Sequence, residues 1–425
     1  MKANFFMSKY QKKVITFGCR LNNLESGLID LQLSKESIDN VFVFNTCAVT
    51  AEAERKAKQN IRKIKKENPE AKIIVTGCAA QINPNKWLDM KEVFKVIGNF
   101  EKTNQKFWNG FANHNDKPAI RDIMKVKKEE ADFSGLIHQN SRYFLQIQNG
   151  CDHRYTFCII PFGRGNSRST DIGTILKNVD EAIQNNFKEV VLTGVDLTSW
   201  GKEFFPNNLS LGYVLKKILK EFKNLPRLRV SSIDPAEIDY DLMDVLQNDH
   251  RLMPHLHLSI QHGDDLILKR MKRRHLFRDV MNLIYEAKRR RPQMTFGADI
   301  IAGFPTETLE AHKNTLKLIK EAEINFTHVF PFSPREGTPA AKMKKLAKEI
   351  IIERAREIRV LGQKNKTNYF KTLINTNKKV LVEHGNKGYT ECYSKVQFSE
   401  NLRPGSLVDT YILSSNSDSL EGRLL

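Results

Sequence analysis

Residues 41–78 read VFVFNTCAVTAEAERKAKQNIRKIKKENPEAKIIVTGC. The apolar run Val41–Phe44 predicts a buried strand, Ala51–Lys66 a basic helix, and Lys72–Thr76 another strand. A strand–helix–strand unit of this length favours a parallel α/β sheet. The quoted stretch therefore predicts an α/β fold for the first part of the chain.

The same alternation continues in both directions. Val14–Phe17 predicts a strand and Asn22–Leu33 a helix, which gives a first domain at residues 11–115. Six further strand candidates alternate with helical stretches within residues 137–367: Tyr143–Gln148, Glu189–Thr193, Leu228–Ile233, His255–Ile260, Thr295–Ile301 and Thr327–Phe332. Six repeats are too few for a full eight-stranded barrel, so we expect a partial (βα)6 barrel with its site at the carboxyl ends of the strands.

The end of the chain has a different character. Ala340–Lys364 predicts a long charged helix. Residues 368–425 then hold short β-like runs separated by Gly and Asn turns, which predicts a small β-barrel. These runs are Lys379–Glu383, Ser394–Phe398 and Leu407–Leu413.

Composition narrows the class of protein. The chain has 425 residues and a formal net charge of +19, and a charge of this size and sign favours a polyanionic partner such as RNA or DNA. We see neither a secretory signal nor an apolar run of transmembrane length, so we expect a cytoplasmic protein. In that reducing compartment its six cysteines are better suited to metal ligation or catalysis than to disulfides.

Three cysteines of the first domain share one setting, because Cys19, Cys47 and Cys78 each follow an apolar strand. The carboxyl ends of neighbouring parallel strands lie together, so these thiols are expected to converge. Three thiolates with one open position suit a reactive iron–sulfur cluster. The alternative is three ordinary buried thiols, since free cysteine is among the most buried residue types.

A second cysteine group follows the strand candidate that ends at Gln148. Cys151 and Cys158 enclose six residues, which by itself is a weak sign of a metal site. The glycine-rich, basic stretch Pro161–Ser169 follows directly and is typical of an anion-binding or substrate-facing loop.

Residues 151–165, CDHRYTFCIIPFGRG, resemble the radical S-adenosylmethionine motif of the methylthiotransferase family, in which three cysteines are spaced Cys-x-x-x-Cys-x-x-Cys. The segments Thr16–Asn22, Asn45–Arg55 and Thr76–Gln81 agree with the same family. Their variants are most similar to the branch that methylthiolates threonylcarbamoyl-adenosine next to the tRNA anticodon. The resemblance covers almost the whole chain, and the tail resembles the family's RNA-binding TRAM domain.

The resemblance implies two [4Fe–4S] clusters. One is held by the second cysteine group, binds S-adenosylmethionine and generates a 5′-deoxyadenosyl radical. The other, on Cys19, Cys47 and Cys78, handles the sulfur, and a second S-adenosylmethionine supplies the methyl group. The implied partners are tRNA, whose anticodon-loop bases can be splayed out, and an electron donor of the flavodoxin or ferredoxin type.

The resemblance also suggests residues for the S-adenosylmethionine pocket. Thr193, Gly194, Arg229 and Ser259 fall at predicted strand ends, where the family binds this cofactor. The ordinary alternative for each is a turn former or a helix cap.

The middle position of the three-cysteine motif is Tyr155. A phenol titrates at roughly pH 10 and is a harder ligand than sulfur, so it is a poor replacement for a thiolate. Three explanations are open: a degenerate homologue, a cluster completed by Asp152 or His153, or a sequence variant. The main hypothesis is a tRNA methylthiotransferase, and the alternatives are a non-catalytic tRNA-binding homologue and a methylthiotransferase acting on a ribosomal protein.

Two further features have less specific interpretations. The basic segment Lys269–His275 either contacts phosphate or forms a solvated helix end. Cys392 lies in the β tail, away from both cysteine groups, and we interpret it as a plain thiol.

Overall fold

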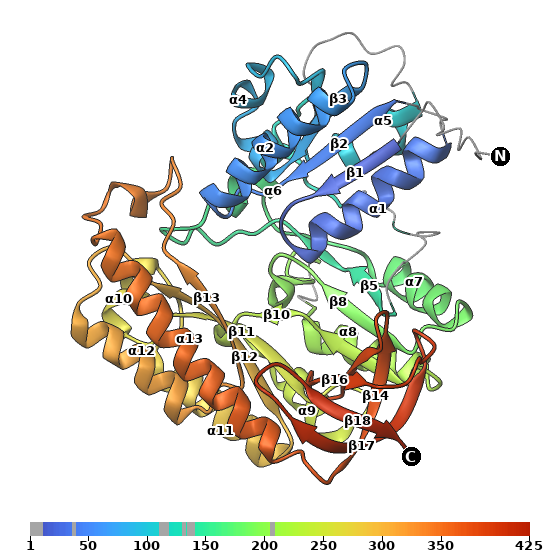
Figure 1. Ribbon diagram of the computed structural model, residues 1–425, viewed down its shortest axis with the longest axis vertical. Helices are drawn as coiled ribbons and strands as arrows, with labels where there is room; N and C mark the ends of the chain where they lie inside the picture. Colours follow the sequence, from blue (N-terminus) through green and yellow to red (C-terminus); the bar gives the residue numbers. More distant parts are fainter. Residues whose placement is uncertain (1–11, 36–39, 110–118, 130–132, 134–140, 205–208) are drawn as a thin grey trace, which may run out of the picture. The chain divides into compact units, whose positions relative to one another are not determined.

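The computed structural model describes residues 12–35, 40–109, 119–129, 133, 141–204 and 209–425 (Figure 1). The chain forms two compact units, the first made of residues 1–137, 149–153 and 158–168, and the second of the remainder. The predicted domain boundaries at residues 11, 115 and 137 lie outside the described residues.

The first unit contains the parallel sheet that residues 41–78 predict. Its strands are β1 (Lys12–Thr16), β2 (Val41–Thr46), β3 (Lys72–Gly77) and β4 (Lys95–Val96), in that order. Its helices are α1 (Arg20–Lys35), α2 (Ala51–Glu67), α3 (Cys78–Ile82), α4 (Asn85–Leu88), α5 (Gln105–Asn109) and α6 (Ile160–Arg164). The predicted strands and helices of this unit are confirmed to within two residues at their ends.

Alternation along the strands explains how the helices cover this sheet. Phe42 and Phe44 of β2 pack in one cluster with Ile61 of α2, whereas Val43 packs in another with Ile29 of α1. The two helices therefore lie on opposite faces of the sheet (Figure 1). Cys47 and Cys78 directly follow β2 and β3, at the carboxyl edge of the sheet.

The second unit contains the partial barrel. One sheet has the order β5 (Tyr143–Gln146), β8 (Glu189–Thr193) and β9 (Arg227–Val230). The other has the order β10 (Ser232–Ile233), β11 (His255–Gln261), β12 (Thr295–Ala302) and β13 (Phe326–Pro331). The strand predicted at 228–233 is thus divided at Ser231 between the two sheets.

Helices of this unit follow the strands. They are α7 (Ile172–Gln184), α8 (Leu211–Glu221), α9 (Tyr240–Asn248), α10 (Asp265–Met271), α11 (Phe277–Arg290), α12 (Leu309–Glu321) and α13 (Lys348–Lys371). All except α10 contribute apolar residues to one large core, whereas Ile267 and Met271 of α10 belong to a smaller cluster. Where the chain passes between the units it forms the short strands β6 (Gln148–Asn149) and β7 (Arg168–Ser169).

The long charged helix differs from its predicted range of 340–364, because α13 begins only at Lys348. The backbone N–H of Ala340 donates to the carbonyl of Thr156 at 2.9 Å, so the chain at Ala340 pairs with the segment around Thr156 instead of starting the helix. At its other end α13 continues through residue 368, and Phe370 enters the core of the C-terminal barrel. The predicted boundary between residues 367 and 368 therefore falls inside a helix.

A closed barrel forms the end of the chain, as predicted. Its strands, in spatial order, are β14 (Asn377–Glu383), β15 (Lys387–Thr390), β16 (Lys395–Phe398), β18 (Leu420–Leu424) and β17 (Leu407–Ser415). No helix among the described residues is long and apolar enough to cross a lipid bilayer.

Candidate active site

The three thiols of the first unit lie at the carboxyl edge of its sheet, where the strand-end pattern predicts them. Cys47 directly follows β2, Cys78 is the first residue of α3 directly after β3, and both are buried, whereas Cys19 is exposed. Gly18 adopts φ +114°, and a Cβ there would lie 2.8 Å from the Cβ of Cys47 and 3.1 Å from its Sγ. Only glycine allows the chain after β1 to approach Cys47 this closely.

Two amide side chains contact these thiols. The Cys19 thiol donates to Asn22 Oδ1 at 3.5 Å, and the Asn22 amide donates to the Thr46 carbonyl at 3.1 Å, next to Cys47. On the other side, the Asn99 amide donates to Cys78 Sγ at 3.7 Å. The amides thus hold the cysteine loops in place by hydrogen bonds of a kind that orients metal ligands.

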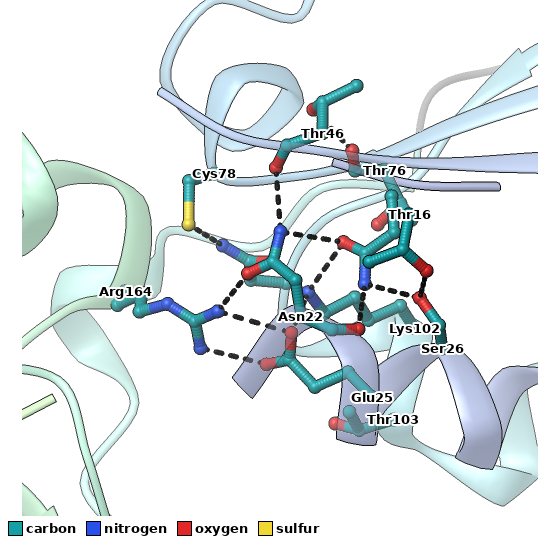
Figure 2. Close-up of polar contacts among 12 residues, drawn as sticks. Thr16, Asn22, Glu25, Ser26, Thr46, Thr76, Cys78, Lys102, Thr103 and Arg164 are labelled. Atoms are coloured by element: carbon teal, nitrogen blue, oxygen red, sulfur yellow. Dashed lines mark hydrogen bonds and ion pairs between the residues drawn. The ribbon is translucent and has the colours of Figure 1, made fainter. Parts of the chain in front are cut away.

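A buried ionic network lies directly behind the thiols (Figure 2). Arg164 of α6 donates from Nη1 to Glu25 Oε1 at 2.8 Å and from Nη2 to Asn22 Oδ1 at 2.6 Å. Lys102 Nζ donates to the other oxygen of Glu25 at 2.6 Å. All three charged side chains are at most 2% exposed.

Two cations share one carboxylate in this network, so one positive charge is left in excess beside the thiols. Burial raises the pKa of Glu25, but the charges of Arg164 and Lys102 outweigh it and hold that pKa below its usual value. Burial and the neighbouring Cys78 raise the pKa of Cys47 to about 11. Cys47 therefore needs a positive partner, either a metal or a neighbouring cation, to ionise.

The structure corrects the prediction for Pro161–Ser169. Arg164 is fully engaged in the internal network, and Arg168 is also buried, where it donates to the carbonyls of Arg164 and Asn166 at 3.0 and 2.8 Å. The basic residues of this stretch therefore hold the protein together instead of facing a substrate.

Cys151 and Cys158 of the second cysteine group also belong to the first unit, whereas the residues between them, 154–157, belong to the second. The Cys151 N–H donates to the Gly165 carbonyl at 3.0 Å, and a Cβ on Gly150 would lie 1.9 Å from the Asn166 carbonyl oxygen. A ring nitrogen of His153 lies within 4.8 Å of Cys151 Sγ. The carboxylate of Asp152 accepts from the Ser167 N–H at 3.0 Å, so Asp152 caps the loop backbone.

Tyr155 belongs to the second unit and is held by charged neighbours there. Its phenol donates to Asp234 Oδ2 at 2.8 Å, and the Arg273 guanidinium lies 4.5 Å from its ring centre. Burial raises the pKa of Tyr155 far above its usual value, against the opposing charge of Arg273. The phenol is therefore held in its neutral form by burial and by its hydrogen bond to Asp234.

The same contacts correct the prediction for Lys269–His275. Arg273 and His275 are buried, and Arg273 pairs with Asp234 at 3.2 Å. Arg274 also reaches this carboxylate, at 3.4 Å. These residues form the cage of Tyr155. The correction concerns Arg273 and His275, whereas Lys269 and Lys272 are exposed at the carboxyl end of α10, in agreement with a solvated helix end. Cys392, by contrast, is a buried thiol, as predicted.

Thr193 and Gly194 lie at the carboxyl end of β8. The Thr193 hydroxyl donates to Ser231 Oγ at 3.4 Å, and a Cβ on Gly194 would lie 2.9 Å from Gln148 Oε1. Ser259 lies in β11, and its carbonyl accepts a hydrogen bond from Arg273. Thr193 and Gly194 thus share one strand end, as predicted.

The structure does not bring Arg229 to this strand end. Its Nε donates to Glu189 Oε1 at 2.8 Å, and Glu189 is the first residue of β8 whereas Thr193 is the last. Its Nη2 donates to the carbonyl of Glu391 in the C-terminal barrel at 3.1 Å. Arg229 therefore points to the amino end of the strands, away from the predicted cofactor pocket.

Sequence reasoning missed Glu25 and Lys102. A sequence pattern in α1 does point to Glu25. Asn22, Glu25 and Ser26 share one face of this helix, whose other buried positions are mostly leucines. A polar stripe at this spacing on a buried helix indicates an internal polar site. Lys102 offers no such signal, because it follows irregular chain and its partner lies 77 residues away.

Comparison with known proteins identifies the matching families. Residues 145–319 match the Radical SAM superfamily, and residues 11–98 match the Uncharacterized protein family UPF0004. The chain is 47% identical to the threonylcarbamoyladenosine tRNA methylthiotransferase MtaB of Rickettsia prowazekii (strain Madrid E), over 96% of each chain. The enzyme of the same name from Aquifex aeolicus (strain VF5) is 33% identical over 93% of this chain and 98% of its own length.

More distant proteins share the fold. The tRNA-2-methylthio-N(6)-dimethylallyladenosine synthase of Pelagibacter ubique (strain HTCC1062) is 30% identical over 96% of each chain. Among solved structures, the radical S-adenosylmethionine methyltransferase TsrM of Kitasatospora setae aligns with a TM-score of 0.56. It covers 78% of this chain and 73% of its own at 11% identity, a likeness that concerns the fold alone.

Proposed function

This chain belongs to the family of the threonylcarbamoyladenosine tRNA methylthiotransferases, and we propose that it adds a methylthio group to carbon 2 of N6-threonylcarbamoyladenosine in tRNA. The observation that carries the proposal is the set of three thiols at the carboxyl edge of the first sheet, backed by an excess buried positive charge. The 47% identity to the Rickettsia enzyme extends over 96% of the chain and so supports the same assignment for both units.

Cys19, Cys47 and Cys78 fit a [4Fe–4S] cluster. Thiolates are the usual donors for such a cluster, and three of them leave one iron open. Gly18 gives the backbone the close approach that a bulky group needs. When bound, this cluster supplies the sulfur chemistry of the reaction. Arg164 and Lys102 offset the negative charge of the ligands, and Asn22 and Asn99 orient Cys19 and Cys78.

The second cysteine group does not supply the three thiolates that the resemblance implies. Cys151 and Cys158 are present, but the Tyr155 hydroxyl donates a hydrogen bond to Asp234 and burial raises the pKa of this tyrosine. Tyr155 is the specific observation behind the alternative function, a non-catalytic tRNA-binding homologue. The comparisons favour the enzyme over this alternative, since relatives of 47% and 33% identity carry the enzyme's name.

For the cofactor and the partners we keep the predictions that agree with the geometry. Thr193, Gly194 and Ser259 are the proposed S-adenosylmethionine residues, and Arg229 is dropped from that set. The net charge of +19 and the closed C-terminal barrel support tRNA as the partner. An electron donor of the flavodoxin or ferredoxin type and a cytoplasmic location complete the proposal.

Anaerobic reconstitution with iron and sulfide tests the function. The enzyme is expected to take up the first cluster, and Cys47→Ser should abolish that uptake while Cys392→Ser, a matched buried thiol, should not. Threonylcarbamoyladenosine should accumulate without its methylthio group in tRNA from cells that lack the gene, as read by nucleoside mass spectrometry. If wild-type protein restores methylthiolation in those cells, the non-catalytic alternative fails; if only Tyr155→Cys does, the enzyme proposal fails for this chain.

A further inference from the structure

Three polar side chains that the proposed machinery does not use meet in the second unit. His257, Asp299 and His328 come from the adjacent parallel strands β11, β12 and β13. His257 Nε2 lies 3.0 Å and His328 Nδ1 lies 3.5 Å from the same oxygen, Asp299 Oδ1. The two imidazole centres are 4.7 Å apart. We refer to these three residues as the His–Asp–His cluster.

The cluster lies on the face of the sheet that the helices do not cover. Phe296, Ala298 and Ile300 of β12 belong to the large core under the helices, so Asp299 projects to the opposite, inner face. The strand register pairs Asp299 with His328 and His257 with Gly297, which places the cluster on three neighbouring strands.

At the amino ends of the strands this inner face is covered by the C-terminal barrel. Toward the amino ends of the strands, Thr295 donates to the Cys392 carbonyl of the C-terminal barrel at 3.0 Å, and His255 stacks on Tyr393. Toward the carboxyl ends, β11 continues from His257 to Ser259, one of the proposed cofactor residues. The cluster therefore lies between the covered end and the end at which such barrels bind substrates.

The cluster is accessible and polar. The side chains of His257 and Asp299 are 14% and 24% exposed, and that of His328 is 61% exposed. Burial raises the pKa of Asp299, but hydrogen bonds from both imidazoles outweigh it and hold that pKa well below its usual range. Asp299 is thus an anion with two imidazoles beside it, and a ligand can reach them from solvent.

We propose that the His–Asp–His cluster binds the polar N6 substituent of the modified adenosine, and so selects it over unmodified or isoprenoid-bearing adenosine. The inference rests on the proposed function and names the residues that read the substrate. The threonylcarbamoyl group carries a carboxylate, a hydroxyl and an amide-like N–H. The hydroxyl and the amide-like N–H of this group can donate to Asp299, and His328 Nε2, the ring nitrogen not turned to Asp299, is the imidazole donor available to the carboxylate.

Selectivity follows from the cost of desolvation. An apolar substituent in this position would cover an aspartate and two imidazoles without offering them hydrogen bonds. Sites built to hydrogen-bond a substrate group reject analogues that lack it by factors on the order of 10⁴ in the best cases. A half-exposed cluster of this kind should give a smaller factor.

Two imidazoles and a carboxylate are also common metal donors. A metal-binding histidine usually donates its second ring nitrogen to a carbonyl or carboxylate, which fixes the ring. Here the Nδ1 of His257 packs against Gly297, where a Cβ would lie 2.4 Å away. Among the described residues, the second nitrogen of neither ring has such a hydrogen-bond partner. The geometry therefore favours an organic ligand over a metal ion.

The test measures binding of anticodon stem-loop RNA to the full-length protein. One RNA carries N6-threonylcarbamoyladenosine, a second unmodified adenosine and a third isopentenyladenosine. Wild-type protein should bind the first RNA at least ~10-fold more tightly than the others. His257→Gln with His328→Gln, and Asp299→Asn separately, should bring this ratio close to one while binding of unmodified RNA stays unchanged. His250→Ala, an exposed histidine outside the cluster, is the control.

Two results would overturn the proposal. One is a ratio that survives both sets of substitutions in protein whose thermal unfolding matches wild type. The other is stoichiometric metal in purified protein that Asp299→Asn removes without changing the ratio. The proposed function fails separately, when tRNA nucleosides from cells lacking the gene are unchanged.

Discussion

Glu25→Gln should destabilise the first unit strongly. The substitution keeps the size of the side chain but removes the carboxylate that Arg164 and Lys102 share at 2.8 and 2.6 Å. Two cations would then be buried beside each other without an anion. Removing one partner of a buried ion pair costs about 3–5 kcal/mol, because the remaining charge stays desolvated.

Thermal unfolding provides the measurement. For a unit of roughly 150 residues each kcal/mol lowers the midpoint by about 2–4 °C, so the expected shift of the first unit is about 6–20 °C. Amide hydrogen exchange in β2 and β3 separates this unit from the second one. Glu52→Gln is the matched control: its pair with Arg55 is more than half exposed, and its loss should leave the unfolding midpoint nearly unchanged.

A double substitution distinguishes charge from packing. Glu25→Gln combined with Lys102→Met removes one of the two buried cations that Glu25→Gln leaves without an anion. Arg164 then keeps two acceptors, the amide oxygen of Asn22 and the amide oxygen of the new side chain at position 25. Stability should recover by about half or more if the loss is electrostatic. A shift for Glu25→Gln no larger than that of Glu52→Gln would refute the reasoning.

Three other predictions concern separate sites. Burial raises the pKa of Glu189, but the charges of Arg229 and Arg142 outweigh it and lower that pKa to about 2. The stabilisation by Glu189 is therefore complete above about pH 4.5 and is lost as pH falls toward 2. Glu189→Gln should flatten that part of the pH–stability curve and lower the free energy of unfolding by about 3 kcal/mol at pH 7. Gly18→Ala should sharply reduce iron bound at the first cysteine site, measured after reconstitution, because the new Cβ meets Cys47 at 2.8 Å. Tyr155→Phe should lower the free energy of unfolding by only about 1 kcal/mol in urea titrations, since Asp234 keeps its arginine partners; a loss above about 3 kcal/mol would contradict this account of the cage.

Local sequence patterns were sufficient for the strands of the first unit's parallel sheet. Val41–Phe44 and Lys72–Thr76 are short apolar runs between clear turn and helix signals, and the structure pairs them in parallel register. The carboxyl-edge position of the cysteines followed from the same reasoning. Local patterns could not predict which side chains, distant in sequence, form buried ion pairs. Arg164, for example, pairs with Glu25, which is 139 residues away in sequence.

Charged residues were the main source of error, for one physical reason. Arginines at 164, 229 and 273 were expected at phosphate, cofactor or solvent, but each is buried against a carboxylate. From sequence alone a basic residue is predicted to face solvent, because burying its charge without a partner is costly. Its compensating acid lies on another strand or helix, so the pair becomes visible only once the fold is known.

The C-terminal barrel is joined to the partial barrel by more than α13. Arg227 donates to the carbonyl of Lys379 at 2.6 Å, Arg229 to that of Glu391 at 3.1 Å, and Thr295 to that of Cys392 at 3.0 Å. Removing residues 377–425 would therefore take these backbone acceptors away from Arg227 and Arg229 and leave Glu189 as their remaining partner. This barrel is not an interchangeable module: in evolution its loss or replacement would require coordinated changes in β9 and β12, and a truncation meant to isolate the core should yield aggregated protein.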